Sequence, residues 1–88
     1  MHQMFYTYIL FSPRIDRFYI GCTSNLEERL IKHINKNKGF TNQADDWEIV
    51  YSKAFSAKHE ALNLEKQIKS WKSKIRIQKL IDSEHPDA

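Results

Sequence analysis

The architecture of this chain follows from residues 18–33, FYIGCTSNLEERLIKH, which predict a short strand, a tight turn and a helix in immediate succession. Phe18, Tyr19 and Ile20 are aromatic or β-branched, which is typical of a half-buried strand. Gly21 lets the backbone turn sharply or approach another group closely, because it has no Cβ. The stretch therefore joins a strand directly to a helix.

The helix is expected over residues 25–36. Ser24 and Glu27 have the spacing of a capping box, in which each side chain bonds the other residue's amide. Its apolar stripe has helical spacing and consists of Leu26, Leu30 and Ile34. Arg29 and His33 lie four residues apart at the edge of this stripe, close to the end of the strand. The strand and the helix thus deliver a tyrosine, an arginine and a histidine to one place.

Two further strands are predicted. Residues 4–12, MFYTYILFS, form a continuous apolar and aromatic run that favours a strand buried on both faces. Pro13 ends this run, and the strand of Tyr19 follows within hairpin distance, so the two are expected to pair antiparallel. Residues 47–55, WEIVYSKAF, alternate as a third strand does. The apolar residues expected to share one face of it are Trp47, Ile49 and Tyr51.

The remaining segments are a loop and helices. Residues 37–46 are polar and contain Gly39, so they are predicted as a loop. A helix capped by Ser56 is expected to begin near Ala57, with an apolar stripe at helical spacing. Its members are Ala57, Ala61, Leu64, Ile68 and Trp71. A short helix over residues 75–81 follows, and the pattern leaves open whether the two are separate. The predicted fold class is α+β, a three-stranded antiparallel sheet with helices packed on it in the order ββαβαα.

Length and composition bound the function. The 88 residues, of which 41% are hydrophobic and 28% charged, predict one domain over residues 1–88. Its core is expected at about residues 4–81, with a frayed tail at 82–88. No apolar run approaches the ~20 residues of a membrane span, and Cys22 alone forms no internal disulfide. We therefore expect a cytoplasmic protein without membrane contact.

The basic residues gather in the C-terminal third, although the formal net charge is only +3. They are Lys66, Lys69, Lys72, Lys74, Arg76 and Lys79. The ordinary interpretation of such a run is a solvated helix face. A basic face beside a cleft is also the electrostatic footprint of a protein that binds phosphate backbones.

Four titratable side chains are expected where strands and helices meet: Tyr8, Tyr19, Arg29 and Glu65. Each has a structural alternative. The tyrosines fit a core with hydrogen-bonded hydroxyls, and the arginine fits a surface position with its stem packed on a leucine. Glu65 and Lys69 have the spacing of an exposed i,i+4 ion pair worth about 0.2–0.5 kcal/mol. A structural role for His33 is equally compatible with its position.

The chain resembles the GIY-YIG nuclease family. Tyr19-Ile20-Gly21 is the second motif in literal form, and Tyr6-Thr7-Tyr8 keeps the final tyrosine of the first. The ordered set that carries the resemblance is Tyr8, Tyr19, Arg29, His33 and Glu65. The likeness covers about residues 4–81 and is closest to small stand-alone bacterial proteins that resemble the N-terminal nuclease domain of the bacterial repair excinuclease.

The resemblance implies divalent-metal-dependent hydrolysis of DNA phosphodiesters, in DNA repair or processing. Glu65 would be the single protein ligand of one Mg²⁺ or Mn²⁺ ion, held weakly without substrate. Arg29 would bind the scissile phosphate. Either motif tyrosine, Tyr8 or Tyr19, would help to remove a proton from the attacking water, with His33 sharing the relay or holding the leaving group's phosphate.

The family often has an asparagine about a dozen residues beyond the glutamate, where this chain reads KIRIQ over residues 74–78. Lys69, Lys72 or Lys74 is expected to supply the phosphate contact instead. With no second domain in the sequence, DNA contact is expected to be structure-directed or weakly specific. Two other hypotheses remain open: a nucleic-acid-binding module with little or no catalysis, and a protein-interaction domain whose site has decayed.

Overall fold

The computed structural model describes the backbone of residues 3–35 and 46–84, and the side chains of residues 3–31 and 46–83. Its six elements follow the predicted ββαβαα order, and they are β1 (Phe5–Ser12), β2 (Arg17–Thr23), α1 (Leu26–Asn35), β3 (Glu48–Phe55), α2 (Lys58–Trp71) and α3 (Lys74–Glu84). The predicted fold class is confirmed. Apart from Asp46, the loop predicted over residues 37–46 lies outside the described residues.

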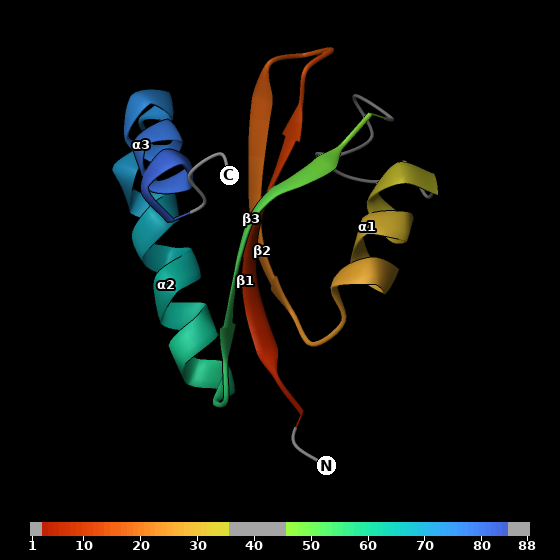
Figure 1. Ribbon diagram of the computed structural model, residues 1–88, viewed down its shortest axis with the longest axis vertical. Helices are drawn as coiled ribbons and strands as arrows, with labels where there is room; N and C mark the ends of the chain where they lie inside the picture. Colours follow the sequence, from red (N-terminus) through yellow and green to blue (C-terminus); the bar gives the residue numbers. More distant parts are fainter. Residues whose placement is uncertain (1–2, 36–45, 85–88) are drawn as a thin grey trace.

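The three strands form one antiparallel sheet in the order β2-β1-β3. The long apolar run of β1 is central, which explains why it carries no polar alternation. Figure 1 shows the sheet nearly edge-on, with α2 and α3 covering one face and α1 on the other. In the described part of the chain, no helix has the length and apolar character needed to cross a membrane.

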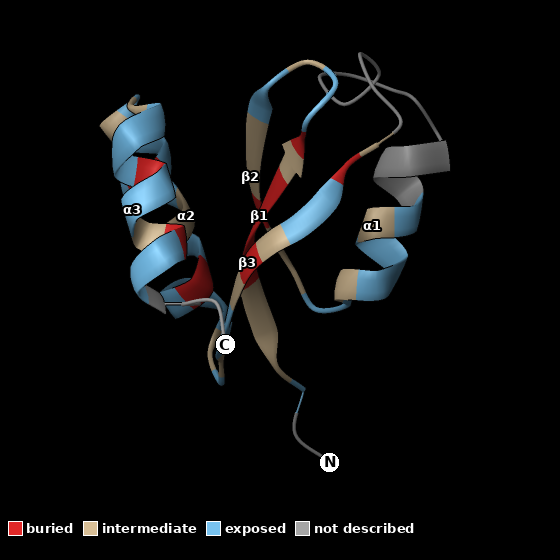
Figure 2. Ribbon diagram, turned by 45° about the horizontal axis from the view of Figure 1, so that its top comes forward, coloured by how far each residue is buried: buried red, intermediate tan, exposed pale blue. Residues whose placement is uncertain are grey.

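Each face of the sheet has its own apolar cluster. On the side of α2 and α3, the buried residues are Ile9, Tyr51, Ile68, Ile77 and Ile81. On the side of α1, they are Tyr8, Leu10 and Trp47, with Leu26 and Leu30 of α1 packed against them. Buried positions are concentrated on the strands and on the inward faces of α2 and α3 (Figure 2). The motif strands therefore lie in the best-packed layer of the molecule.

The alternation predicted for β3 is wrong, because the strand contains a bulge. Ile9 pairs with Tyr51 but Leu10 pairs with Ile49, so one extra residue, Val50, separates the two pairs. An extra residue reverses which face the following side chains occupy. Trp47 consequently packs on the α1 side and Tyr51 on the α2 side, while Ile49 is 36% exposed.

The turn predicted at Gly21 and the capping box at Ser24 are also wrong. Strand β2 continues through Gly21 to Thr23, and α1 begins one residue later than the capping box requires. The side-chain oxygen of Asn25 accepts the Glu28 N–H at 3.1 Å and so caps the helix. The Thr23 hydroxyl in turn accepts the Asn25 N–H at 3.1 Å. The strand-to-helix connection thus takes place within two residues.

Helices α2 and α3 are separate. The N-cap of α2 is Ala57, with no side-chain hydrogen bond, so the cap predicted at Ser56 is wrong. Lys72 ends α2 in the left-handed conformation, with φ of 52°. Ser73 then caps α3, because its hydroxyl accepts the Arg76 N–H at 3.2 Å. Helix α3 continues three residues past the core boundary predicted at residue 81, to Glu84.

Candidate functional site

A pocket of about 350 Å³ lies against β2 and receives side chains from both faces of the sheet. We call it the β2 pocket. Four of the five expected catalytic residues line it: Tyr8, Tyr19, Arg29 and Glu65. They come from β1, β2, α1 and α2, so residues far apart in sequence meet in one solvent-open hollow. The fifth, His33, belongs to α1, but its side chain lies outside the described residues.

The two motif tyrosines lie on the α1 side of neighbouring strands. Their ring centroids are 6.5 Å apart and the planes are tilted by 32°. The Tyr19 ring also meets the edge of Trp47, with centroids 6.5 Å apart and an interplanar angle of 69°. Tyr8 is only 3% exposed, whereas Tyr19 is half-buried. The two phenols therefore differ in their access to water although they share a pocket.

Gly21 has a steric role beside Tyr8. The two residues are direct partners across β1 and β2, and the Tyr8 ring lies over the Gly21 backbone. A Cβ at Gly21 would be 2.5 Å from Tyr8 Cζ and 2.9 Å from Cε2. The glycine of the Tyr19-Ile20-Gly21 motif is thus required for the close approach of a tyrosine ring, one of the two uses expected for it.

Arg29 is placed by the start of α1. Its backbone N–H donates to the Asn25 carbonyl at 3.1 Å, in the first hydrogen-bonded turn after the cap. Leu26 and Leu30 pack against the cluster that contains Tyr8, which fixes the helix against the sheet. The exposed Arg29 side chain then lines the pocket as a cation at its open side.

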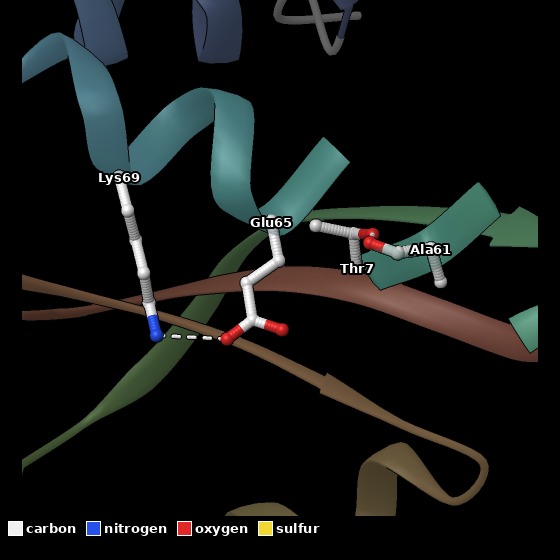
Figure 3. A network of polar contacts seen from close by, with 4 residues as sticks. All are labelled: Thr7, Ala61, Glu65 and Lys69. Carbon is white, nitrogen blue, oxygen red and sulfur yellow. Dashed lines mark hydrogen bonds and ion pairs between the residues drawn. The ribbon is translucent and has the colours of Figure 1, made fainter. Parts of the chain in front are cut away.

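Glu65 is placed by an anchor between β1 and α2. The buried Thr7 hydroxyl donates to the Ala61 carbonyl at 2.6 Å, and both residues are 0% exposed. Ala61 is one helical turn before Glu65, so this bond fixes the turn that carries the carboxylate. In Figure 3, Glu65 and Lys69 extend from α2 toward β2. Lys69 Nζ is 2.8 Å from Glu65 Oε2, with 54% of the lysine and 17% of the glutamate side chain exposed.

The predicted i,i+4 pair of Glu65 and Lys69 is therefore present. It does not turn the glutamate away from the site, because Glu65 lines the β2 pocket as well. The carboxylate is largely covered and already neutralised by an ammonium group. The structural and the functional interpretations of Glu65 are compatible in this arrangement.

The pocket affects the acidity of its own side chains. Burial is the main cause that raises the pKa of Tyr8 well above the ordinary value of a phenol, and the neighbouring Tyr19 raises it further. Arg29 acts in the opposite direction, and Glu65 again raises the pKa of Tyr8. Burial, followed by the charge of Glu65, also raises the pKa of the Cys22 thiol. Tyr8 and Cys22 therefore keep their protons at neutral pH.

Sequence reasoning missed several residues of the pocket. Lys58 and Leu62 of α2 line it, as do Cys22 and Thr23 at the end of β2. The signal for the α2 pair was the spacing from Glu65, because residues 58, 62, 65 and 69 share one helical face. The pocket therefore has a second cation, Lys58, which comes from α2 opposite the helix of Arg29.

The three lysines predicted to bind nucleic acid do not line the β2 pocket. Lys69, Lys72 and Lys74 line a neighbouring hollow of about 290 Å³ at the corner between α2 and α3, together with Arg17. Lys74 Nζ is 2.6 Å from Asp16 Oδ2, and both side chains are exposed. We call this second site the corner hollow.

Acidic residues elsewhere have structural roles. Asp46 accepts hydrogen bonds from the Ser12 hydroxyl and, at 2.9 Å, from the Arg14 N–H, so it holds the β1–β2 turn. The Ser12 bond is the main cause that lowers the pKa of Asp46. Its sequence neighbour Asp45 lies outside the described residues. Residues 3–35 and 46–84 contain no group of three or more histidine, cysteine or acidic side chains placed to hold a metal ion.

The geometry defines a class of protein, and comparison with known proteins identifies it. A family model described as the GIY-YIG catalytic domain matches residues 4–80. The chain belongs to the GIY-YIG family, whose domains are of the nuclease type.

Similar proteins carry the name UPF0213. The UPF0213 protein OB0043 of Oceanobacillus iheyensis is 39% identical over 78% of this chain and 80% of its own length. The UPF0213 protein of Bacillus pumilus is 34% identical over 76% of this chain and 78% of its own. The solution NMR structure of UPF0213 protein BH0048 from Bacillus halodurans has a TM-score of 0.61 and 26% identity, covering 96% of this chain and 88% of that one.

Proposed function

We propose that this protein is a divalent-metal-dependent DNA endonuclease that hydrolyses phosphodiester bonds in the β2 pocket, with structure-directed or weak specificity, in DNA repair or processing. The observation that carries the proposal is the meeting of Tyr19, Arg29 and Glu65 in one open pocket. A phenol, a guanidinium and a carboxylate are the groups needed to move a proton, bind a phosphate and hold a cation.

The residues present fit one Mg²⁺ or Mn²⁺ ion. Of the carboxylates in the described part of the chain, Glu65 is the one that lines the pocket. Magnesium keeps several waters and takes phosphate oxygens as further ligands, so a single carboxylate is enough when substrate is bound. When bound, the ion would supply charge stabilisation for the phosphate. A lone carboxylate paired with Lys69 would hold it weakly in the absence of DNA.

The two helices supply the cations for the substrate. Arg29 of α1 binds the scissile phosphate, and its guanidinium stabilises the charge that increases in the transition state. Lys58 of α2 lines the same pocket and holds the phosphate from the other side. The positive charge is therefore supplied by two rigid elements that the sheet keeps apart.

The two tyrosines have different tasks. The raised pKa of Tyr8 favours a neutral phenol that donates a hydrogen bond and orients the phosphate or the water. Tyr19 is half-buried and lines the same pocket, so it is the better group to accept the proton of the attacking water. His33, on the helix of Arg29, shares that proton relay. Lys69, Lys72 and Lys74 contact the DNA backbone beside the pocket.

A cleavage assay tests this function. Nicked, branched and single-stranded DNA are incubated with Mg²⁺ or with EDTA, using wild-type protein and Glu65→Gln. The matched control is Glu60→Gln, an exposed glutamate in the first turn of the same helix. We expect metal-dependent cutting by the wild type and the control, and a loss of at least a hundredfold in Glu65→Gln. Equal cutting by Glu65→Gln would attribute the activity to a contaminant.

A nucleic-acid-binding module without catalysis is the second candidate. The observation that favours it is the ion pair, because Lys69 occupies a carboxylate oxygen that a metal ion needs. Moreover, Gln78, near the position of the family's asparagine, bonds Asp82 at 3.0 Å and does not line the β2 pocket. This candidate predicts salt-sensitive DNA binding, equal in wild type and Glu65→Gln, with no cleavage of any DNA form.

A further inference from the structure

The corner hollow combines cations with an apolar floor. Its cations are Arg17, Lys69, Lys72 and Lys74. Lys69 is paired with Glu65 and Lys74 with Asp16. Arg17 and Lys72 contact no carboxylate among the described residues. Two uncompensated positive charges and two that exchange partners readily are a surface for an anion.

The floor of the corner hollow is aromatic and aliphatic. Phe18 and Ile20 of β2 form one side, and Ile68 and Ile77 of the two helices form the other. The Phe18 ring is tilted by 45° against Phe11, with centroids 5.0 Å apart. An aromatic ring in an open hollow offers a face on which a flat apolar group stacks, as bases do in proteins that bind single strands.

The corner hollow and the β2 pocket are neighbours. Successive side chains of β2 alternate between them, because Tyr19 lines the pocket whereas Phe18 and Ile20 line the hollow. The ion pair of Glu65 and Lys69 joins the two, with the glutamate in the pocket and the lysine in the hollow. β2 is an edge strand, so a chain that crosses this edge passes from one site to the other.

We propose that the corner hollow binds one unpaired nucleotide of a DNA strand, with its base stacked on Phe18 and its phosphate at Arg17 and Lys72, adjacent to the phosphate in the β2 pocket. The nucleotide is unpaired because a base that enters the hollow leaves its complementary strand. A volume of about 290 Å³ accommodates one nucleoside and excludes a duplex. The inference rests on the proposed function, and it names the substrate class as DNA with a single-stranded segment beside the cut.

Binding without catalysis tests the proposal. Fluorescence anisotropy in EDTA compares a blunt duplex with the same duplex carrying a single-stranded tail that contains 2-aminopurine. We expect the tail to bind the wild-type protein at least tenfold more tightly, with a change in 2-aminopurine fluorescence on stacking. Phe18→Leu keeps an apolar side chain but loses the aromatic face, so it should weaken tail binding about tenfold. Phe18→Tyr should restore the affinity.

The charges are tested in the same assay. Arg17→Gln and Lys72→Gln should each weaken tail binding and lower the slope of log affinity against log salt by about 0.7. The matched control is Lys53→Gln, on β3 at the opposite edge of the sheet, which should bind as the wild type does. Equal affinity for blunt and tailed duplexes, or equal losses in Lys53→Gln and Lys72→Gln, would overturn the proposal.

Failure of the nuclease proposal is distinguishable from failure of this one. If no DNA is cut but the tail binds through Phe18, the subsite stands as a binding site alone. If DNA is cut while Phe18→Leu binds and cuts as the wild type does, the subsite is wrong and the nuclease stands. Binding of an acidic peptide in place of DNA would overturn the choice of a nucleotide.

Discussion

Replacing Gly21 by alanine tests the packing on which the β2 pocket depends. The new Cβ would lie 2.5 Å from Tyr8 Cζ, so the ring has to move away from β2. Tyr8 is 3% exposed and belongs to a buried cluster with Leu10 and Trp47, so its ring has little space to move into. Gly21→Ala should therefore shift the phenol and strain the core together.

The expected magnitude is a balance of two effects. Alanine gains about 0.5–1 kcal/mol over glycine within a strand, because it loses less backbone freedom on folding. Overpacking a close-packed core costs about 1–3 kcal/mol. The clash should prevail, so Gly21→Ala lowers the free energy of unfolding by about 1–2 kcal/mol. For a domain of this size, each kcal/mol corresponds to a decrease in Tm of about 4–8 °C.

Urea unfolding of a double-mutant cycle measures this effect. The cycle contains the wild type, Gly21→Ala, Tyr8→Leu and the double variant, because leucine removes the ring atoms that clash. In the Tyr8→Leu background, Gly21→Ala should be neutral or slightly stabilising, with a coupling energy of at least about 1 kcal/mol. The same destabilisation in both backgrounds, or a Gly21→Ala protein more stable than the wild type, would refute the steric role.

Three further predictions follow from the described contacts. Thr7→Val removes the bond to the Ala61 carbonyl and should lower the free energy of unfolding by about 1 kcal/mol; Thr7→Ser should recover stability and also cleavage, if the bond positions Glu65, and a kcat unchanged in Thr7→Val would contradict that role. Because burial raises the pKa of Tyr8 in the folded state, the stability that this phenol contributes is fully present below its ordinary pKa of about 10 and is lost as pH rises further. The difference in unfolding free energy between wild type and Tyr8→Phe should thus be constant from pH 7 to 9 and shift against the wild type above pH 10, by at most about 1.4 kcal/mol per pH unit; parallel pH profiles would contradict it. Lys72→Gly should raise the free energy of unfolding by about 1 kcal/mol in thermal melts, since glycine adopts the left-handed conformation without strain, and an unchanged Tm would contradict this.

Local patterns predicted much of the fold and of the site. The apolar run of β1 and the motif strand β2 were recognisable because a central strand lacks polar alternation. Tyr19 and Arg29 are joined by a short strand-to-helix connection, so their proximity depends on local structure alone. Glu65 was identified by resemblance and not by periodicity, because its place in the pocket depends on how α2 crosses the sheet.

The errors occur where several residue types satisfy the same local rule. Ser24 and Asn25 are both good N-caps, and the choice is made by β2 continuing to Thr23, which sequence does not reveal. The bulge at Val50 has no glycine or proline to mark it, so an alternating pattern was extended through it. Lys72 ends a helix without the glycine that usually signals such an end. Tertiary packing decides each of these cases.

The left-handed backbone at Lys72 separates two demands on this corner of the molecule. A sequence optimised for folding alone would carry glycine there, because glycine is relaxed in that conformation. A long cationic side chain at a strained position represents stability given up in exchange for something else, a compromise common at functional surfaces. An engineered variant hardened at this residue should therefore become sturdier and grip polyanions less firmly, so gains in thermal robustness would be a poor guide to fitness for its task.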